Sequence, residues 1–359
     1  MTGVLFSVLL LVRALLHLVG VSRNRPGAKA GQILPLRLLW LLAAALFLSA
    51  FICRMAHVPW WYTAAAGIFI SQGVIASRWR EAKAGTAINV AIMIAAVLAA
   101  VQQHFRTEAL KTAEIMLTTA AGSKQTVTTK QIAGLPPVVQ LWLRRSGITD
   151  NEVPATVRLK QNGRMRLKPT GKWIPVSAEQ YFRTDTPSFI WLARVGKSPI
   201  YFAGRDMYKD GHGHMTIKIL SVIPVANATG HETDQGSMLR YLAEMQWFPS
   251  AALSPFVHWR QTAPDAAVAT ITYGGLTDSG TFYFNPGGDV VSFEAMRYMN
   301  DNGSWHMRQW RVPVTKWATM NGVRVPVAGE TIWKMPDGDF NWFEWRIGQI
   351  EYDCRNVYP

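Results

Sequence analysis

The first hundred residues alternate long apolar runs with short polar loops. Four runs, roughly Val4–Val21, Leu34–Met55, Trp60–Ser77 and Gly85–Gln102, are rich in Leu, Ile, Val and Ala. Each approaches the ~20 residues that a helix needs to cross the hydrocarbon core of a bilayer. They are too many and too closely spaced to form a signal peptide. The pattern predicts a membrane helical bundle of about four transmembrane helices over residues 1–103.

The chain changes character after residue 103. Residues 104–134 are polar and helix-prone and then Thr-rich, which is typical of a linker or stalk. The segment "LPPVVQLWLRRSG" at 135–147 follows. Its paired prolines suit the start of a helix and Gly147 suits its end, so a short helix is predicted here.

Short runs of alternating apolar and polar residues dominate from residue 156 to the carboxyl end. Turns are expected at Asn162-Gly163 and within "KDGHG", "NPGGD", "TMNG" and "PVAGE". About ten strands joined by short turns favour an antiparallel meander over βαβ units. A sheet of this size has to curl or cover one face, and a helix expected at 236–247 would cover it. We therefore predict an extracytoplasmic, mainly antiparallel β domain at 135–359, built as a curled sheet or half-barrel with a covering helix.

The expected covering helix, "GSMLRYLAEMQW", carries an apolar stripe and charges together. Met238, Leu242 and Met245 recur at helical spacing. Arg240 and Glu244 lie four residues apart and can pair on the helix surface. In this order such a pair contributes only ~0.2–0.5 kcal/mol.

Glu244 lies between Tyr241 and Trp247 along one side of this helix. Burial among aromatics would raise the pKa of its carboxyl group and could make it a general acid or base. Alternatively, Glu244 binds an inward-pointing arginine, for which Arg297 and Arg346 are candidates. Buried structural pairs are commoner than catalytic acids, so the pairing interpretation is favoured.

Tryptophans are concentrated in the second part of the chain. Eleven of the fifteen follow residue 104, and several alternate along the late strands. They either fill the core, as large aromatics usually do, or line an apolar cavity for a lipid or acyl chain. On the second interpretation the candidate ligand-binding residues are Tyr241, Glu244, Trp247, Trp310 and Trp333.

The motif "DGHGH" offers a possible metal site. Asp210, His212 and His214 would share one face of a strand, and three further residues lie nearby in sequence: His231, Glu232 and Asp234. The same letters also describe a polar hairpin tip, which we favour. The two cysteines, Cys53 and Cys354, show no metal-binding spacing. The sequence predicts no metal site and no cofactor, and the catalytic residues, if any, are unknown.

The charge distribution predicts the topology. Residues 1–103 hold nine basic residues and one acidic residue, so eight of the fourteen net positive charges lie there. The first and third loops carry four and three Lys or Arg, against Arg54 alone in the second. The positive-inside rule places the two basic loops in the cytoplasm and residues 104–359 outside the cytoplasmic (inner) membrane. Membrane topology thus explains the excess charge, and nucleic acid is not an expected partner.

Arg13 lies in the middle of the first apolar run, and His17 shares its helix face. Charges at this depth usually face other helices or water. Arg13 either belongs to a functional site within the bundle or has no function, as a bundle-facing or snorkelling arginine or in a first segment that lies shallow in the membrane.

Several segments in order resemble an uncharacterised bacterial domain family of unknown function. These are "LPPVVQLWLRRSG", "VRLKQNGRMRL", "DMYKDGHGHMTIKILSVIPVANATG", "GSMLRYLAEMQWFPSA", "FEAMRYMNDNG", "NGVRVPVAGETIW" and "DGDFNWFEWRIGQIEYD". The resemblance covers about residues 135–353 and implies no catalytic residues. The strand-rich layout with an inner helix is also distantly similar to the half-barrel carriers of bacterial lipoproteins and lipids, which implies an apolar-ligand carrier.

Three functions are compatible with this sequence. The favoured one is a membrane-anchored cell-envelope protein that binds a lipid or acyl chain through its outer β domain. The second is an envelope enzyme that uses Glu244 and Tyr241 with His212 or His214. The third is a structural partner of another envelope protein.

Overall fold

The computed structural model describes residues 2–22, 30–122, 125–197, 200–301 and 303–359. The chain divides into two compact units, Met1–Phe105 and Arg106–Pro359. We call them the helical unit and the β unit. The predicted domain boundaries at 103/104 and 134/135 stay predictions.

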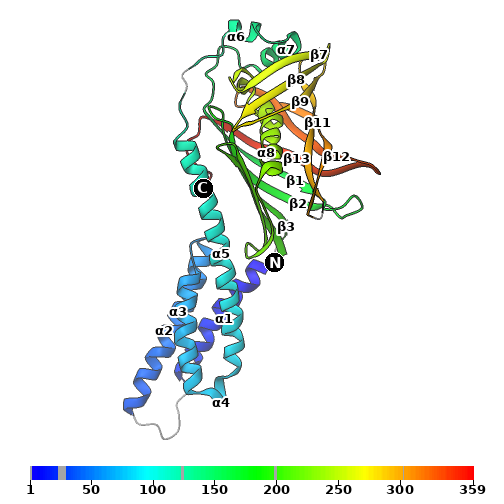
Figure 1. Ribbon diagram of the computed structural model, residues 1–359. Helices are drawn as coiled ribbons and strands as arrows, with labels where there is room; N and C mark the ends of the chain where they lie inside the picture. Colours follow the sequence, from blue (N-terminus) through cyan, green and yellow to red (C-terminus); the bar gives the residue numbers. More distant parts are fainter. Residues whose placement is uncertain (1, 23–29, 123–124, 198–199, 302) are drawn as a thin grey trace. The chain divides into compact units, whose positions relative to one another are not determined.

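The helical unit contains all four apolar runs as helices, as predicted (Figure 1). Its elements are α1 (Thr2–Ser22), α2 (Ala30–Met55), α3 (Trp61–Ser77), the short α4 (Trp79–Ala82) and the first part of α5 (Ala84–Thr118). Three of these helices, α1, α2 and α5, are long and apolar enough to cross a membrane. With 17 residues, α3 reaches the lower limit of about 17 for a spanning helix.

Packing in the helical unit suits an apolar surrounding. Its core combines four alanines, among them Ala14, Ala50 and Ala64, with larger side chains such as Phe47. Large side chains such as Phe69, which is 80% exposed, point outward instead. Small residues at helix contacts and large apolar ones outside are the arrangement that lipid-facing helices adopt.

The β unit contains one sheet of thirteen strands in the order β6-β5-β4-β3-β2-β1-β13-β12-β11-β10-β9-β8-β7. The strands are β1 (Thr156–Met165), β2 (Ile174–Arg183), β3 (Ser188–Lys197), β4 (Ile200–Lys209), β5 (His212–Ile219), β6 (Ile223–Ala228), β7 (Val257–Ala263), β8 (Ala266–Tyr273), β9 (Leu276–Phe284), β10 (Val290–Asp301), β11 (Ser304–Met320), β12 (Val323–Met335) and β13 (Gly338–Tyr352). The first strand, β1, lies in the middle of the sheet. The following strands run to one edge at β6, the chain crosses to the other edge at β7, and the later strands return until β13 pairs with β1. The predicted antiparallel, curled and unclosed sheet is confirmed.

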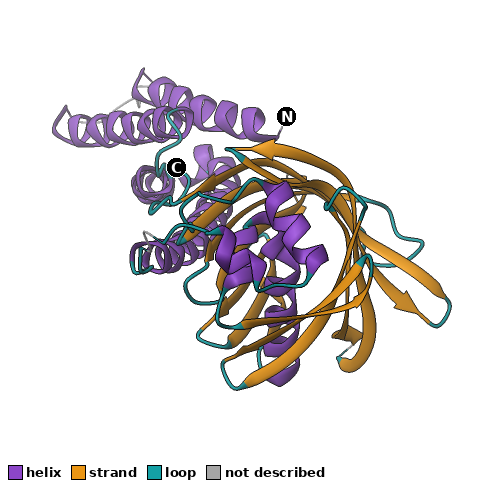
Figure 2. Cartoon of the chain, turned by 90° about the horizontal axis from the view of Figure 1, so that it is seen from above, coloured by secondary structure: helices purple, strands orange, loops and turns teal. Residues whose placement is uncertain are grey.

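The crossing from β6 to β7 places a helix inside the curl (Figure 2). It consists of α8 (His231–Glu244) and the 3-10 turns η1 (Met245–Trp247) and η2 (Pro249–Leu253). Helix α8 contacts β4, β5, β8, β9 and β10. We call the sheet face that contacts α8 the inner face. The curl brings the β4–β5 and β8–β9 turns together, where a Cβ added to Gly211 would lie 2.6 Å from Cα of Gly274.

The predicted covering helix exists, but its bounds and surroundings differ from the prediction. It begins at His231, five residues before Gly236, and its last turn is 3-10. All residues from Gln235 to Glu244 except Arg240 are buried, so the helix is enclosed and not one-sided. An enclosed helix cannot be recognised from one apolar stripe, because both sides face protein.

Two predicted turns are wrong. Asn162-Gly163 and "PVAGE" lie inside the continuous strands β1 and β12. A Cβ at Gly163 would lie 2.2 Å from O of Glu344, and one at Gly329 would lie 2.5 Å from O of Pro313. These glycines allow a neighbouring strand to approach closely. A sequence pattern does not distinguish a glycine in this role from a glycine that forms a turn. The sheet has thirteen strands and not about ten, chiefly because β2 and β6 were not recognised as separate strands.

The short helices of the β unit follow local signals. Helix α7 (Pro137–Ser146) begins after Pro136 and ends at Gly147, whose φ of 77° is left-handed, as predicted. Helix α6 (Thr129–Ala133) is capped by Thr128 and Gln131.

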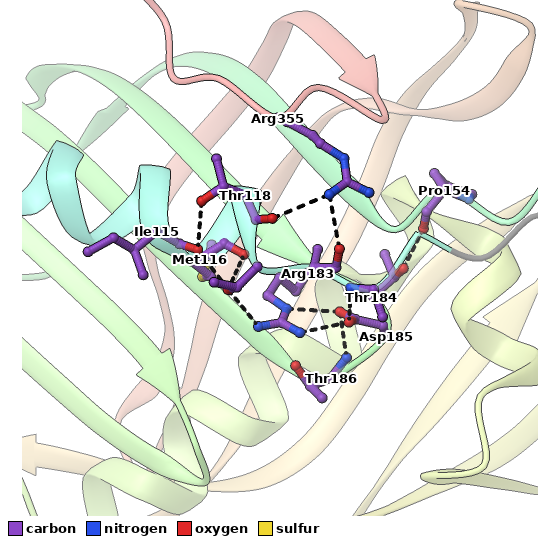
Figure 3. Close-up of polar contacts among 12 residues, drawn as sticks. Ile115, Met116, Thr118, Pro154, Arg183, Thr184, Asp185, Thr186 and Arg355 are labelled. Atoms are coloured by element: carbon purple, nitrogen blue, oxygen red, sulfur yellow. Dashed lines mark hydrogen bonds and ion pairs between the residues drawn. The ribbon is translucent and has the colours of Figure 1, made fainter.

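The end of α5 joins the β unit (Figure 3). Its buried residues Ala109, Ala113 and Leu117 pack in a small cluster with Tyr181 of β2. Polar contacts then bind the chain beyond α5 to the β2–β3 turn, where the amide N of Ala121 donates to Asp185 at 2.8 Å. Residues 106–122 are therefore packed on the outer side of the sheet.

Candidate binding site on the inner face of the sheet

Helix α8 carries its two charges into the core. Arg240 Nε donates to Glu244 Oε1 at 2.9 Å, and Arg240 Nη1 donates to Asp206 Oδ2 of β4 at 2.6 Å. Gln180 of β2 donates to the second oxygen of Glu244 at 2.7 Å. The guanidinium also lies 4.9 Å from the ring centroid of Trp191. The predicted Arg240–Glu244 pair is confirmed, but it lies inside the protein and not on a helix surface.

We expected an inward-pointing arginine, Arg297 or Arg346, to bind Glu244. The arginine that binds it in the structure is Arg240. Burial raises the pKa of Glu244, and the Arg240 guanidinium and the Gln180 amide oppose this effect. Burial disfavours the cation of Arg240, but Glu244 and Asp206 outweigh it and raise the pKa of Arg240. Both carboxylate oxygens of Glu244 are bonded to protein donors, so the geometry favours a structural role over acid–base chemistry.

Tyr241 and Trp247 are also bonded within the core. The Tyr241 hydroxyl donates to O of Arg183 at 3.1 Å, and Trp247 Nε1 donates to O of Pro326 at 3.1 Å. The Tyr241 ring packs against Phe248 and the Trp247 ring against Phe182, and these two phenylalanines contact each other. These two residues fix the helix to the sheet on both sides.

Trp310 and Trp333 form a separate group further along the inner face. They are direct cross-strand partners on β11 and β12. Trp310 is 5% exposed, and its buried Nε1 has no hydrogen-bond partner in the described part of the chain. A buried donor without an acceptor is costly, which makes this position a candidate for contact with a ligand.

Arg297 of β10 covers these tryptophans. Its guanidinium carbon lies 4.7 Å from the ring centroid of Trp310 and 5.8 Å from that of Trp333. Its Nε donates to O of Gly236 in α8 at 2.9 Å. Among the described residues no carboxylate lies within ion-pair distance of Arg297. Burial lowers the pKa of Arg297 to about 10, with Asp206 acting in the opposite direction, so the side chain remains a cation at neutral pH.

A second arginine, Arg308, stands directly opposite Arg297 in the β10–β11 pair. Cross-strand partners have Cβ atoms about 4.5–5.5 Å apart, and like charges there repel. The pair marks a change in exposure along β10, because Phe293 and Ala295 are buried whereas Arg297 is partly exposed. We call Arg297, Arg308, Trp310 and Trp333 the Arg297 site.

The five predicted ligand-binding residues are therefore all buried in one core but in three groups. Glu244 binds Arg240, Tyr241 and Trp247 pack against Phe248 and Phe182 respectively, and Trp310 and Trp333 belong to the Arg297 site. Gln180, Asp206 and Arg308 were not predicted. The register of the β10–β11 hairpin, in which Asp301 pairs with Ser304, would have placed Arg308 opposite Arg297. The contact of Gln180 could not be predicted because β2 was not recognised as a strand.

The "DGHGH" motif forms the β4–β5 hairpin, as predicted. Asp210 lies in the turn with a left-handed φ of 54°. His212 Nδ1 lies 3.3 Å from Asp234 Oδ2, whereas His214 contacts Asn227 and Arg205 of the outer face. Within the described residues there is no group of three or more His, Cys, Asp or Glu side chains that could hold a metal ion.

In the helical unit, Arg13 and His17 face the bundle. Arg13 Nη2 donates to Ser71 Oγ at 2.8 Å and to Asn89 Oδ1 at 2.9 Å. His17 Nε2 lies 2.9 Å from the same Ser71 oxygen. These contacts join α1, α3 and α5 through a buried polar network.

The fold thus defines a class of protein with apolar helices followed by one curled antiparallel sheet around a central helix. The chain belongs to the DUF6544 family, a family of unknown function whose model matches residues 125–345. This confirms the resemblance seen in the sequence. No curated protein matches the chain at a significant level.

Two solved structures are similar to the chain at low identity. A DUF1329 family protein from Desulfovibrio piger is 8% identical with a TM-score of 0.33, and the match covers 60% of this chain and 92% of that one. A domain assigned as an outer membrane lipoprotein-sorting protein domain from Vibrio parahaemolyticus is 5% identical with a TM-score of 0.34, covering 62% and 93%.

Proposed function

We propose that this protein is a membrane-anchored component of the cell envelope that binds a lipid or acyl chain with an acidic head group. The inner face of the β unit is the binding surface, and the Arg297 site holds the head group. The anchor consists of the helices α1, α2, α3 and α5 in the cytoplasmic membrane, with the β unit on the outer side.

The observation that carries this proposal is the state of Arg297. A cation that lies over two tryptophans, beside a second arginine and without a described carboxylate in ion-pair distance, is suited to an anionic ligand. The unpartnered Trp310 Nε1 adds a neutral donor at the same place. The surrounding aromatic surface suits an apolar chain, and the nearby basic pair suits its carboxylate or phosphate.

Ligand binding can be measured with the full-length protein in detergent. The probes are a fluorescent fatty acid and its methyl ester, which differ only in the head-group charge. We expect the acid to bind more tightly. Arg297→Gln should weaken binding of the acid by about tenfold or more, because a hydrogen bond to a charged group contributes ~1.5–3 kcal/mol. Binding of the ester should change little.

Arg260→Gln is the matched control, because Arg260 is an exposed arginine on the edge strand β7. It should bind the acid as the unchanged protein does. Circular dichroism should show that both variants are folded. The proposal is wrong if neither probe binds, or if folded Arg297→Gln binds the acid with unchanged affinity.

A further inference from the structure

Two neighbouring hairpins of the β unit expose an unusual number of apolar side chains. They are Ile200 at the start of β4 and Val222, Ile223 and Val225 at β6, with exposed fractions of 68%, 39%, 56% and 53%. Nine large apolar side chains are exposed among the described residues of the β unit, and these four belong to the β3–β4 and β5–β6 hairpins. Single exposed apolar residues are ordinary, but a cluster of this kind marks an interaction surface.

The two hairpins are held side by side. The amide N of Leu220 in the β5–β6 turn donates to O of Tyr201 in β4 at 3.0 Å. Leu220 and Ser221 have φ values of 53° and 64°, so both central residues of this turn are left-handed. That conformation normally selects Gly or Asn. The turn therefore keeps a bulky apolar residue where a glycine would be less strained.

The same segments are basic. Arg194 and Lys197 lie in β3 and Lys218 in β5, and residues 194–205 and 216–230 contain no Asp or Glu. The neighbouring β1–β2 loop adds the exposed Leu167, and residues 153–178 are also without acidic residues. Apolar side chains flanked by cations are the pattern of a surface that binds an anionic bilayer.

The position of the hairpins within the β unit agrees with this reading. Along β2, Arg106 of α5 binds Glu179 at 3.0 Å, whereas the chain after α5 reaches Arg183 and Asp185 (Figure 3). The β3–β4 tip lies on the Arg106 side, because Leu192 pairs with Glu179 and the tip is five residues further at Lys197. In the sequence, Arg106 follows four residues after Gln102, where the apolar run ends. Lys197 and Ile200 thus lie at the end of the β unit where its first residue, Arg106, is bound.

We propose that the described exposed residues of the β3–β4 and β5–β6 hairpins insert into the surface of the bilayer that anchors the chain. Ile200, Val222, Ile223 and Val225 contact the boundary of the acyl chains, and Lys197 lies among anionic head groups. This inference rests on the membrane anchoring proposed above and is independent of a ligand at the Arg297 site.

Lipid quenching tests this contact in the full-length chain. Cys53 and Cys354 are replaced by serine, a single cysteine is introduced by Ile223→Cys, and it carries an environment-sensitive fluorophore. The protein is placed in nanodiscs that contain phosphatidylglycerol and spin-labelled lipid, one copy per disc. We expect a blue-shifted emission and several-fold stronger quenching than for Leu141→Cys. Leu141 is an exposed apolar residue of α7, at the β9–β10 turn.

A second variant tests the charges. Adding Lys197→Glu to Ile223→Cys should reduce the quenching, because one basic residue near an anionic surface strengthens association by about fivefold. Incorporation into the discs reports the anchor separately, so loss of the anchor and loss of the tip contact give different results. Equal quenching at positions 223 and 141 would overturn the proposal. An excimer signal between two pyrene-labelled copies in detergent, without lipid quenching in the discs, would assign the surface to self-association and would also overturn it.

Discussion

At the scale of single residues, buried charge is distributed unevenly over the inner face. Arg240 is shared by Asp206 and Glu244, whereas within the described part of the chain Arg297 donates to the carbonyl of Gly236, lies over two tryptophan rings and has no ion pair. A buried cation that has carboxylate partners is a structural element, because removing a partner leaves a charge uncompensated. A cation without them retains its capacity to bind an anion. This difference distinguishes the structural ion pairs of Arg240 from the candidate site at Arg297.

Asp289 provides a residue-scale prediction about pH. It accepts two hydrogen bonds from Arg324, at 2.6 and 3.0 Å, and its side chain is 9% exposed. Burial opposes the carboxylate, but Arg324 dominates and lowers the pKa of Asp289 below 3.8. The stabilisation is therefore complete above pH 3.8 and is lost as pH falls through the lower folded-state pKa.

We expect Asp289→Asn to lower the free energy of unfolding of the full-length protein by about 1–3 kcal/mol at pH 7. The difference from the unchanged protein should shrink as the pH falls below 4. Denaturant titrations in detergent at a series of pH values measure both effects. Asp265→Asn, at an exposed turn position, is the control and should leave the curve unchanged. A pH-independent difference for Asp289→Asn would contradict the ion-pair explanation.

At the scale of elements, Gly163 and Gly329 allow long strands to approach their neighbours closely. Gly329 lies in β12 where the pairing with β11 is irregular, between Val314 and Lys316. A Cβ at Gly329 would lie 2.4 Å from Cζ2 of Trp345 as well as 2.5 Å from O of Pro313. No L side chain fits there without displacement of backbone.

Gly329→Ala should therefore destabilise the full-length protein by about 1–3 kcal/mol, as overpacking of a core usually does. Gly348→Ala in the adjacent strand β13 is the matched control, since the nearest atom to its Cβ would be 3.7 Å away. The control should be neutral within about 0.5 kcal/mol. Thermal unfolding followed by circular dichroism compares them, and equal midpoints would show that the close approach at Gly329 is not required.

At the scale of the whole molecule, the charges of the loops predict a topology that can be tested. The first and third loops between the apolar helices hold four and three Lys or Arg, and the second holds one. We expect a reporter that is active only outside the cytoplasmic membrane to be active when fused after Pro359. A reporter active only in the cytoplasm should be silent there.

The same loops supply a matched perturbation. Changing Arg23, Arg25, Arg78 and Arg80 to Gln removes most of the bias and should give a mixed orientation. Changing Arg158, Arg164, Arg166 and Arg194 of the β unit to Gln removes the same charge and should leave the orientation intact. The opposite reporter pattern in the unchanged protein would refute the topology and the outer location of the β unit.

Features that depend on local pattern could be predicted from the order of the residues alone. Four apolar runs became helices and the alternating segments became strands, because hydrophobic periodicity is a property of neighbouring residues. The ends of α7 at Pro136 and Gly147 followed for the same reason, since capping uses only local backbone groups.

Features that depend on contacts between residues distant in sequence became visible in the folded chain. From the sequence, Gly163 and Gly329 could belong to turns or to strands. The fold brings the strand of Glu344 close to Gly163 and the strand of Pro313 close to Gly329, which places both glycines within strands. From the sequence, Glu244 could pair with any inward-pointing arginine. In the fold it pairs with Arg240, which also binds Asp206 of β4. Arg297 is distinguished as a candidate site because no described carboxylate forms an ion pair with it. Such absences of a partner cannot be read from a sequence, because they result from the sheet order as a whole.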